Sequence, residues 1–176
     1  MPVEIIFETH SVTEDNERGI ATGWLPGRLS DRGRSLAREL GVRRRDDGLA
    51  AVFTSDLARA VETAAIAFEG TGLPVRNDRR LRECDYGALN GAPVERLAPR
   101  SRFISTPFPG GESYREVVER VRTFVGDLAP YDGGRILLIG HSATHWALEH
   151  LIAGRPLEDL VDAPFGWQPG WRYRTT

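Results

Sequence analysis

Short runs of apolar residues recur along the chain at intervals that suit β-strands. Residues 3–7, 49–55 and 135–140 are rich in branched and aromatic side chains and carry almost no charge inside each run. Runs of this kind are typical of strands buried on both faces, as in a parallel sheet. Residues 73–78 add a shorter run that is compatible with a further strand.

Longer stretches between these runs place apolar residues three and four positions apart, which is the spacing of one helical face. The pattern predicts helices over residues 29–48, 56–70, 113–128 and about 143–153. Ser30 stands at the start of the first of these, where a hydroxyl can cap the free backbone N–H groups of the first turn. Strands that alternate with helices indicate an α/β fold with a mostly parallel sheet.

The remaining segments predict loops and one more strand. Residues 81–91 have a mixed pattern with two glycines and are interpreted as a loop. Residues 165–174 are predicted to form an aromatic loop and an edge strand, with a turn at Pro169 and Gly170. No internal repeat or long linker is visible, so we expect residues 1–176 to form one domain.

Polar side chains follow three of the predicted strands, at the point where each strand ends. His10 follows the first strand, Ser55 the second and His141 the strand of residues 135–140. In an open α/β sheet, ligands bind beyond the carboxyl ends of the strands. We therefore expect these three side chains to meet at a binding site.

The composition of the chain argues against some classes of binding partner. The formal net charge of the 176 residues is -2, which gives no overall attraction to nucleic acid or to an anionic membrane. No apolar run approaches the length of a membrane span, and the first residues lack the pattern of a secretory signal. Cys84 is the single cysteine, so no intramolecular disulfide can form. We expect a cytoplasmic protein, although other reducing compartments would also fit.

The order of several short segments resembles the histidine phosphatase superfamily, which has the phosphoglycerate-mutase-like fold. The chain carries variants of five motifs of that family in the family's order, namely residues 9–16, 54–64, 81–91, 109–114 and 137–142. The resemblance extends from residue 3 to about residue 154. It implies a three-layer α/β/α fold with a mostly parallel central sheet.

The resemblance also implies phosphoryl transfer through a phosphohistidine. His10 aligns with the nucleophile and Glu83 with the proton donor. The chemistry agrees, because an imidazole has its pKa close to neutral pH and is then a competent nucleophile. From the residues alone, His10 could instead be a strand-end histidine bonded to backbone, and Glu83 a surface glutamate. No metal or organic cofactor is expected.

The phosphate-binding residues implied by the resemblance are Arg59, His141 and Asn16. Arg59 lies at the start of a predicted helix, where its planar fork could reach a phosphate at the sheet edge. Without the motif, Arg59 would be interpreted as a solvated helix residue and Asn16 as a loop cap. Thr22 and Gly23, in a segment shared with the mutases of the family, are implied to help hold the substrate.

Three positions depart from the family pattern at the expected phosphate cradle. Thr9 replaces an arginine, and Ser11 and Ser142 replace the glycines that follow the two histidines. Loss of a charged donor from a transition state costs on the order of 2–4 kcal/mol. We hypothesise a rebuilt cradle in which the hydroxyls of Thr9, Ser11 and Ser142 replace some of the lost donors. The alternative is a slow or non-catalytic homologue that binds a phosphorylated ligand.

In the family that the chain resembles, the true mutases tend to have longer insertions that cover the site, whereas only a short segment lies here between Gly91 and Gly110. Such a site admits water, which favours hydrolysis of a small phosphorylated metabolite over its isomerisation. A mutase-type phosphotransferase is the alternative. A homodimer is left open.

Three other patterns suggest sites but are interpreted as structural. His141 and His145 have the spacing of a zinc pair on a helix, but no acidic residue or cysteine lies between them. We expect His145 and His150 to be ordinary helix residues and Cys84 to be a small packing residue. Residues 43–45, three arginines in a row, are predicted to form a solvated helix face.

Overall fold

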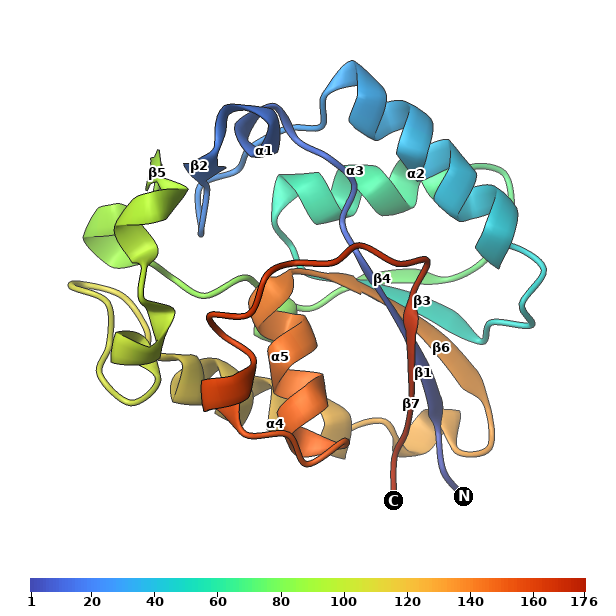
Figure 1. Cartoon of the computed structure of the whole chain (residues 1–176). Coiled ribbons are helices and arrows are strands. Elements are labelled where there is room, and N and C mark those ends of the chain that lie inside the picture. The colour runs from blue at the N-terminus through green and yellow to red at the C-terminus, as the bar shows by residue number, and fades with distance from the viewer.

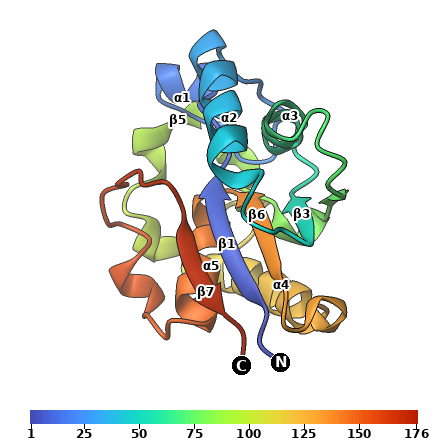
Figure 2. The same ribbon diagram turned by 90° about the vertical axis from the view of Figure 1, so that its right-hand side faces the viewer.

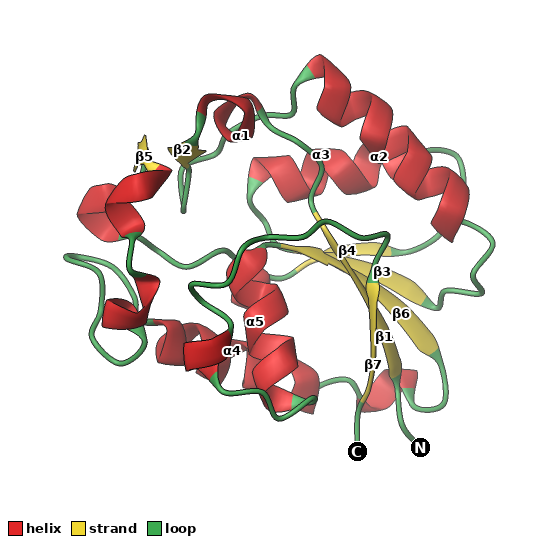
Figure 3. Cartoon of the chain, viewed as in Figure 1, coloured by secondary structure: helices red, strands yellow, loops and turns green.

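A computed structural model, covering residues 1–176, shows a central five-stranded sheet between two pairs of helices (Figures 1 and 3). The strand order is β4-β3-β6-β1-β7. Four strands are parallel, and β7 pairs antiparallel with β1 at one edge. The strands are β1 (Glu4–Thr9), β3 (Ala51–Thr54), β4 (Val75–Asn77), β6 (Arg135–Gly140) and β7 (Trp171–Arg174). The predicted α/β class and mostly parallel sheet are confirmed.

Alternate residues of the strands point to opposite faces, and both faces are covered. Ile6, Val52 and Leu137 are buried against α2 (Asp31–Arg44) and α3 (Ala58–Ala67). Ile5 and Phe53 belong to the larger core on the other face, which is covered by α4 (Tyr114–Gly126) and α5 (Ser142–Leu151). Figure 2 shows the two helix layers on either side of the strands. Burial on both faces explains why the strands are continuous apolar runs.

Side-chain caps fix the starts of α2 and α4. The Ser30 hydroxyl accepts a hydrogen bond from the N–H of Gly33, as the sequence predicts for the start of α2. Ser113 and Glu116 form a reciprocal capping box at the start of α4. The predicted helix of residues 29–48 ends earlier than expected, at Arg44.

A small second layer lies beyond the carboxyl ends of the strands (Figure 1). It contains α1 (Glu14–Arg18) and a two-stranded sheet of β2 (Ile20–Ala21) and β5 (Ala92–Pro93), none of which the sequence pattern predicts. The remaining short elements are single 3₁₀ turns at Arg79–Leu81, Gly87–Leu89, Val94–Leu97, Arg100–Phe103, Ala129–Tyr131 and Leu157–Asp159. Residues of α1 and β2 form one wall of the cavity described below.

The prediction of a solvated face for residues 43–45 is wrong. Arg43 and Arg44 both bind the carboxylate of Glu8, which lies on β1 and is only 1% exposed. Arg44 is itself buried and also donates to the carbonyl oxygen of Pro169, ahead of β7. Only Arg45 is exposed, as predicted. The arginine pair therefore ties α2 to β1 and to the C-terminal segment.

No helix of the structure is both long enough and apolar enough to cross a membrane.

Candidate active site

A cavity of about 690 Å³ opens at the carboxyl ends of β1 and β6. Ten of the eleven residues that the sequence indicated for the site line this one cavity: Thr9, His10, Ser11, Asn16, Thr22, Gly23, Arg59, Glu83, His141 and Ser142. The eleventh, Ser55, does not line it and is joined to the site by its hydrogen bond to His141. The register explains the convergence. Thr9 of β1 pairs with Gly140 of β6, so the histidines that follow these two residues are neighbours.

His10 is held in one tautomer by the backbone. The backbone N–H of His10 donates to the carbonyl oxygen of Gly140 at 2.9 Å, which extends the β1–β6 pairing by one residue. The ring Nδ1 lies 2.7 Å from the carbonyl oxygen of Ser11. A carbonyl only accepts, so Nδ1 carries the proton and the lone pair is on Nε2. Burial, with the Arg59 guanidinium nearby, lowers the pKa of His10 to about 3. The free imidazole is therefore neutral and nucleophilic at ordinary pH.

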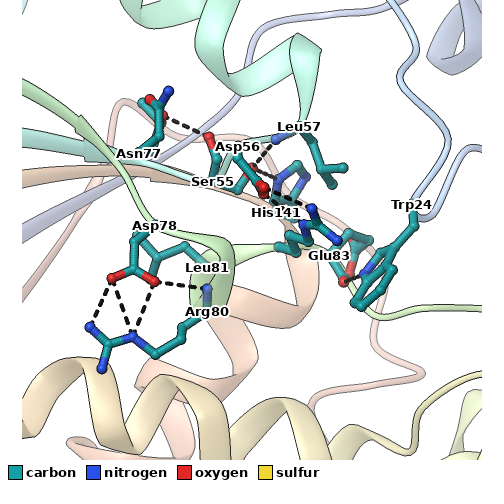
Figure 4. Close-up of polar contacts among 12 residues, drawn as sticks. Trp24, Ser55, Asp56, Leu57, Asn77, Asp78, Arg80, Leu81, Glu83 and His141 are labelled. Carbon is teal, nitrogen blue, oxygen red and sulfur yellow. Dashed lines mark hydrogen bonds and ion pairs between the residues drawn. The ribbon is translucent and has the colours of Figure 1, made fainter.

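His141 lies beside His10, with ring centroids 5.0 Å apart. Its Nε2 is 2.7 Å from the hydroxyl oxygen of Ser55, the residue that follows β3 (Figure 4). The other ring nitrogen, Nδ1, is buried and has no protein partner. Burial lowers the pKa of His141 well below its ordinary value, and Arg59 and His10 act in the same direction. His141 thus has one ring nitrogen bonded to Ser55 and one that no protein atom satisfies.

Arg59 is the arginine whose positive charge lowers the pKa of both histidines. It lies in the first turn of α3, is 3% exposed, and donates from Nη2 to the carbonyl oxygen of Gly23 and from Nη1 to that of Leu25. Gly23 is required here, because it has a φ of 56° and a Cβ would lie 1.9 Å from Oδ1 of Asn90. The loop of Gly23 therefore holds the guanidinium in the cavity wall without a carboxylate partner.

Glu83 enters the cavity from the loop after the first 3₁₀ turn and is 8% exposed. Its Oε1 accepts hydrogen bonds from the backbone N–H groups of Cys84 and Ala143, at 2.8 and 3.2 Å. Its own carbonyl oxygen accepts from Nε1 of Trp24 at 2.7 Å (Figure 4). The same oxygen accepts from Nη2 of Arg120 at 2.9 Å. Glu83 is thus fixed at both main chain and side chain, and is no mobile surface glutamate.

Asn16 and Thr22 have structural partners as well as places in the cavity wall. The Oδ1 of Asn16 accepts from the backbone N–H of Thr13, which completes a capping box on α1. The Thr22 hydroxyl donates to Oδ2 of Asp15 at 2.8 Å. The cap occupies the oxygen of the Asn16 amide, so only its Nδ2 could serve a ligand.

The structure removes one hydroxyl from the hypothesised rebuilt cradle. The Ser11 hydroxyl donates to the carbonyl oxygen of Gly33 on α2 at 2.6 Å, and the Ser11 N–H donates to the hydroxyl of Thr63. A hydroxyl has one proton, so Ser11 cannot also donate to a phosphate in this arrangement. Thr9 and Ser142 are partly exposed and line the cavity, so their hydroxyls remain candidates for the hypothesised cradle.

The patterns interpreted as structural have packing roles. Cys84 is fully buried in the larger core, and burial raises the pKa of its thiol well above the ordinary value. His145 stacks on Phe7, with ring centroids 5.4 Å apart, and lies against Trp171. No three side chains of His, Cys, Asp or Glu gather into a group that could hold a metal.

The sequence did not single out several residues that line the same cavity. Tyr86 precedes the turn Gly87–Leu89, and Arg100 begins the turn Arg100–Phe103. Phe165 and Trp167 come from the segment ahead of β7. The Nε of Arg100 is buried without a partner. Periodicity could not reveal these residues, because they lie in loops and short turns. The aromatic composition of residues 165–174 was a local signal for two of them.

The chain belongs to the histidine phosphatase superfamily (branch 1), whose sequence profile it matches over residues 5–167. This confirms the resemblance to that family; the finding says nothing about the changes at positions 9, 11 and 142. Among its relatives, the 2,3-bisphosphoglycerate-dependent phosphoglycerate mutase of Methylobacterium radiotolerans is 32% identical over 167 residues. That alignment covers 85% of this chain and 79% of the relative.

Solved structures with the same fold include phosphatases. YhfR of Bacillus stearothermophilus superposes with a TM-score of 0.82 at 26% identity, covering 95% of this chain and 88% of its own. A mycobacterial glucosyl-3-phosphoglycerate phosphatase superposes with a TM-score of 0.77 at 28% identity, covering 91% of this chain and 84% of its own. The family therefore includes both hydrolases and mutases at similar distances from this chain.

Proposed function

We propose that the protein is a phosphatase that hydrolyses a small phosphomonoester through a phosphohistidine on His10. The observation that carries the proposal is the fixed tautomer of His10, whose Nε2 lone pair is available in a cavity shared with His141, Arg59 and Glu83. Phosphoryl transfer needs a nucleophile, positive or donor groups for the equatorial oxygens, and an acid for the leaving oxygen. The four side chains fill these roles.

In the first step, Nε2 of His10 attacks phosphorus. The bond from phosphorus to the ester oxygen breaks, and its electron pair goes to that oxygen. The protonated carboxyl of Glu83 gives the oxygen a proton, so the alcohol leaves neutral. Arg59 and Nδ1 of His141 donate to the equatorial oxygens of the transferred group.

In the second step, a water molecule attacks phosphorus opposite Nε2 of the phosphohistidine. The Glu83 carboxylate takes the proton of that water, and the bond from phosphorus to Nε2 breaks with its electrons returning to the imidazole. Inorganic phosphate leaves, and both side chains return to their starting protonation. No metal ion takes part in these two steps.

A phosphoglycerate mutase is the second candidate, because relatives named as mutases are about as similar to this chain as the named phosphatases. A third candidate is a non-catalytic homologue that only binds a phosphorylated ligand, suggested by threonine at position 9. Hydrolysis is favoured because the segment after Gly91 is short and contributes only turns to the cavity wall.

The test is release of inorganic phosphate from p-nitrophenyl phosphate and a panel of phosphorylated metabolites, in buffer that contains a chelator. We expect turnover by the wild type and a loss of at least about a thousandfold in His10→Ala. His150→Ala, at the far end of α5, is the matched control and is expected to keep full activity.

A second measurement identifies the intermediate. Rapid quench with labelled substrate should trap an acid-labile, base-stable phosphoryl group on the wild type and none on His10→Ala. Incubation of phosphoglycerate with 2,3-bisphosphoglycerate separates the two enzyme classes, because a mutase moves the phosphoryl group between hydroxyls and a phosphatase releases it. Binding of substrate with neither reaction would establish the non-catalytic homologue.

A further inference from the structure

Two large aromatic side chains stand exposed at the mouth of the active-site cavity. Phe165 and Trp167 lie in the segment between the last 3₁₀ turn and β7, and are 63% and 60% exposed. Both line the same cavity as His10. An exposed aromatic group beside a catalytic cavity is unfavourable in water unless it covers something apolar.

The segment that carries these rings is fixed to the body of the protein. Arg44 donates to the carbonyl oxygen of Pro169, and the guanidinium carbon of Arg43 lies 5.7 Å from the centroid of the Trp167 ring. Both arginines are held by the buried carboxylate of Glu8 on β1. Three ionic groups and a cation–π contact thus position Trp167 at the cavity.

The wall of the cavity next to these rings carries little net charge. Leu36 and Leu40 of α2 line it, and the charges of Arg43 and Arg44 are balanced by Glu8 and Asp47. Exposed Arg32 and Glu39 on the same helix are of opposite sign. A second anionic group of a ligand would find no unpaired cluster of cations here, whereas an apolar group would find apolar surface on two sides.

We propose that Phe165 and Trp167 bind the alcohol part of the substrate, so that the substrate is a phosphomonoester of a bulky aromatic alcohol. The inference rests on the proposed function, because in-line attack by Nε2 of His10 directs the leaving oxygen away from that ring. The alcohol must therefore occupy the part of the cavity beyond the phosphate. A cavity of about 690 Å³ has the volume of pockets that hold drug-sized ligands.

The first test measures binding without turnover. Titration calorimetry compares 2-naphthylmethylphosphonate with methylphosphonate on the wild type and on Phe165→Ala, Trp167→Ala and Trp167→Phe. We expect the naphthyl compound to bind at least about tenfold more tightly to the wild type. Trp167→Ala should lose most of that preference, Phe165→Ala a part, and Trp167→Phe should restore some of it.

The control variant is Val42→Ala, an exposed apolar residue on α2 outside the cavity, which should keep the wild-type preference. Affinity for methylphosphonate should be the same in all five proteins, and their thermal midpoints should agree because the substituted side chains are exposed. Equal affinity of the wild type for the two phosphonates overturns the inference. So does a naphthyl preference that Trp167→Ala and Phe165→Ala both retain.

The second test measures hydrolysis of 2-naphthylmethyl phosphate and ethyl phosphate, both esters of primary alcohols, so that the acidity of the leaving group is similar. We expect kcat/KM to favour the naphthyl ester in the wild type and the preference to fall in Trp167→Ala. Hydrolysis of both esters with no such preference overturns this inference and leaves the proposed phosphatase intact. Naphthyl binding that depends on Trp167, with no hydrolysis by any variant, supports Phe165 and Trp167 as the aromatic binding surface and overturns the phosphatase.

Discussion

At the scale of single residues, two neighbouring histidines are prepared for different tasks by their hydrogen bonds. His10 has its Nδ1 proton bound to a carbonyl oxygen, whereas His141 has Nε2 bound to Ser55 and a buried Nδ1 without a partner. The first arrangement leaves a lone pair on Nε2, and the second leaves a ring nitrogen that can face a phosphoryl oxygen. In the proposed mechanism, these backbone and hydroxyl partners distinguish the nucleophile from the phosphate ligand.

The role of Glu83 as the acid predicts a dependence on the leaving group. We expect Glu83→Gln to lower kcat/KM for alkyl phosphates by about a hundredfold or more, and for p-nitrophenyl phosphate much less, because a nitrophenolate leaves without a proton. Steady-state rates on both ester classes provide the measurement. Equal losses on both classes would remove Glu83 from this role.

The threonine at position 9 predicts that an arginine introduced there raises activity. The Ser11 hydroxyl is bonded to Gly33, so it supplies no donor in place of the arginine that the family carries before its first histidine. We expect Thr9→Arg to raise kcat/KM on simple phosphomonoesters, by up to about a hundredfold if one contact of ~3 kcal/mol is regained. Thr9→Val is the control for loss of the hydroxyl alone. A fall in kcat/KM in Thr9→Arg would favour a cradle rebuilt around the remaining hydroxyls.

At the scale of elements, the Glu8 carboxylate joins three parts of the chain that are distant in sequence. It lies on β1 and binds Arg43 and Arg44 of α2, and Arg44 also reaches Asp47 and the carbonyl oxygen of Pro169. The charges are buried and paired, so removing Arg44 leaves Glu8 with Arg43 alone and takes a donor from Asp47 and from the Pro169 carbonyl oxygen. This cluster holds the segment that carries Phe165 and Trp167 against the sheet.

The cluster predicts that substitution of Arg44 strongly lowers stability, although the sequence pattern places this residue on an exposed helix face. We expect Arg44→Met to lower the free energy of unfolding by about 3 kcal/mol. The matched control is Arg38→Met, since Arg38 is exposed on the same helix and its loss should change stability by less than about 0.5 kcal/mol. Urea denaturation of the three proteins measures both values, and a similar small loss in the two variants would contradict the structural role of Arg44.

At the scale of the whole molecule, the two histidines of the cavity link stability to pH. Both have a lower pKa in the folded chain than the ordinary 6.5, and His10 is lowered to about 3. Between the folded and unfolded values the unfolded chain binds more protons, so the free energy of unfolding rises with pH. The contribution is complete above the unfolded pKa and is lost as pH falls below it.

We therefore expect the wild type to lose stability between pH 7 and pH 4.5 more steeply than His10→Asn, by up to about 2 kcal/mol over that interval. Urea unfolding at several pH values measures the difference. His150→Asn controls for removal of a histidine outside the cavity and should follow the wild-type curve. Parallel curves for wild type and His10→Asn would show that His10 titrates equally in both states.

The sequence by itself determined the strands and helices of the central fold and the members of the site that follow strand ends. Apolar runs and helical spacing are local signals, and parallel strands bring their carboxyl ends to one edge whatever the loops do. His10, Ser55 and His141 could therefore be expected to meet, and they do. The five ordered motifs added Arg59 and Glu83, which line the same cavity.

Only the tertiary structure decided which of these groups are free to act. The Ser11 hydroxyl is taken by Gly33, Arg44 is drawn into the interior by Glu8, and Trp167 is brought to the cavity by partners on α2. Arg44 and Pro169, for instance, are 125 residues apart in sequence and joined by one hydrogen bond. Periodicity reports which face of an element is apolar, whereas the partner of a polar side chain depends on which distant segment packs beside it.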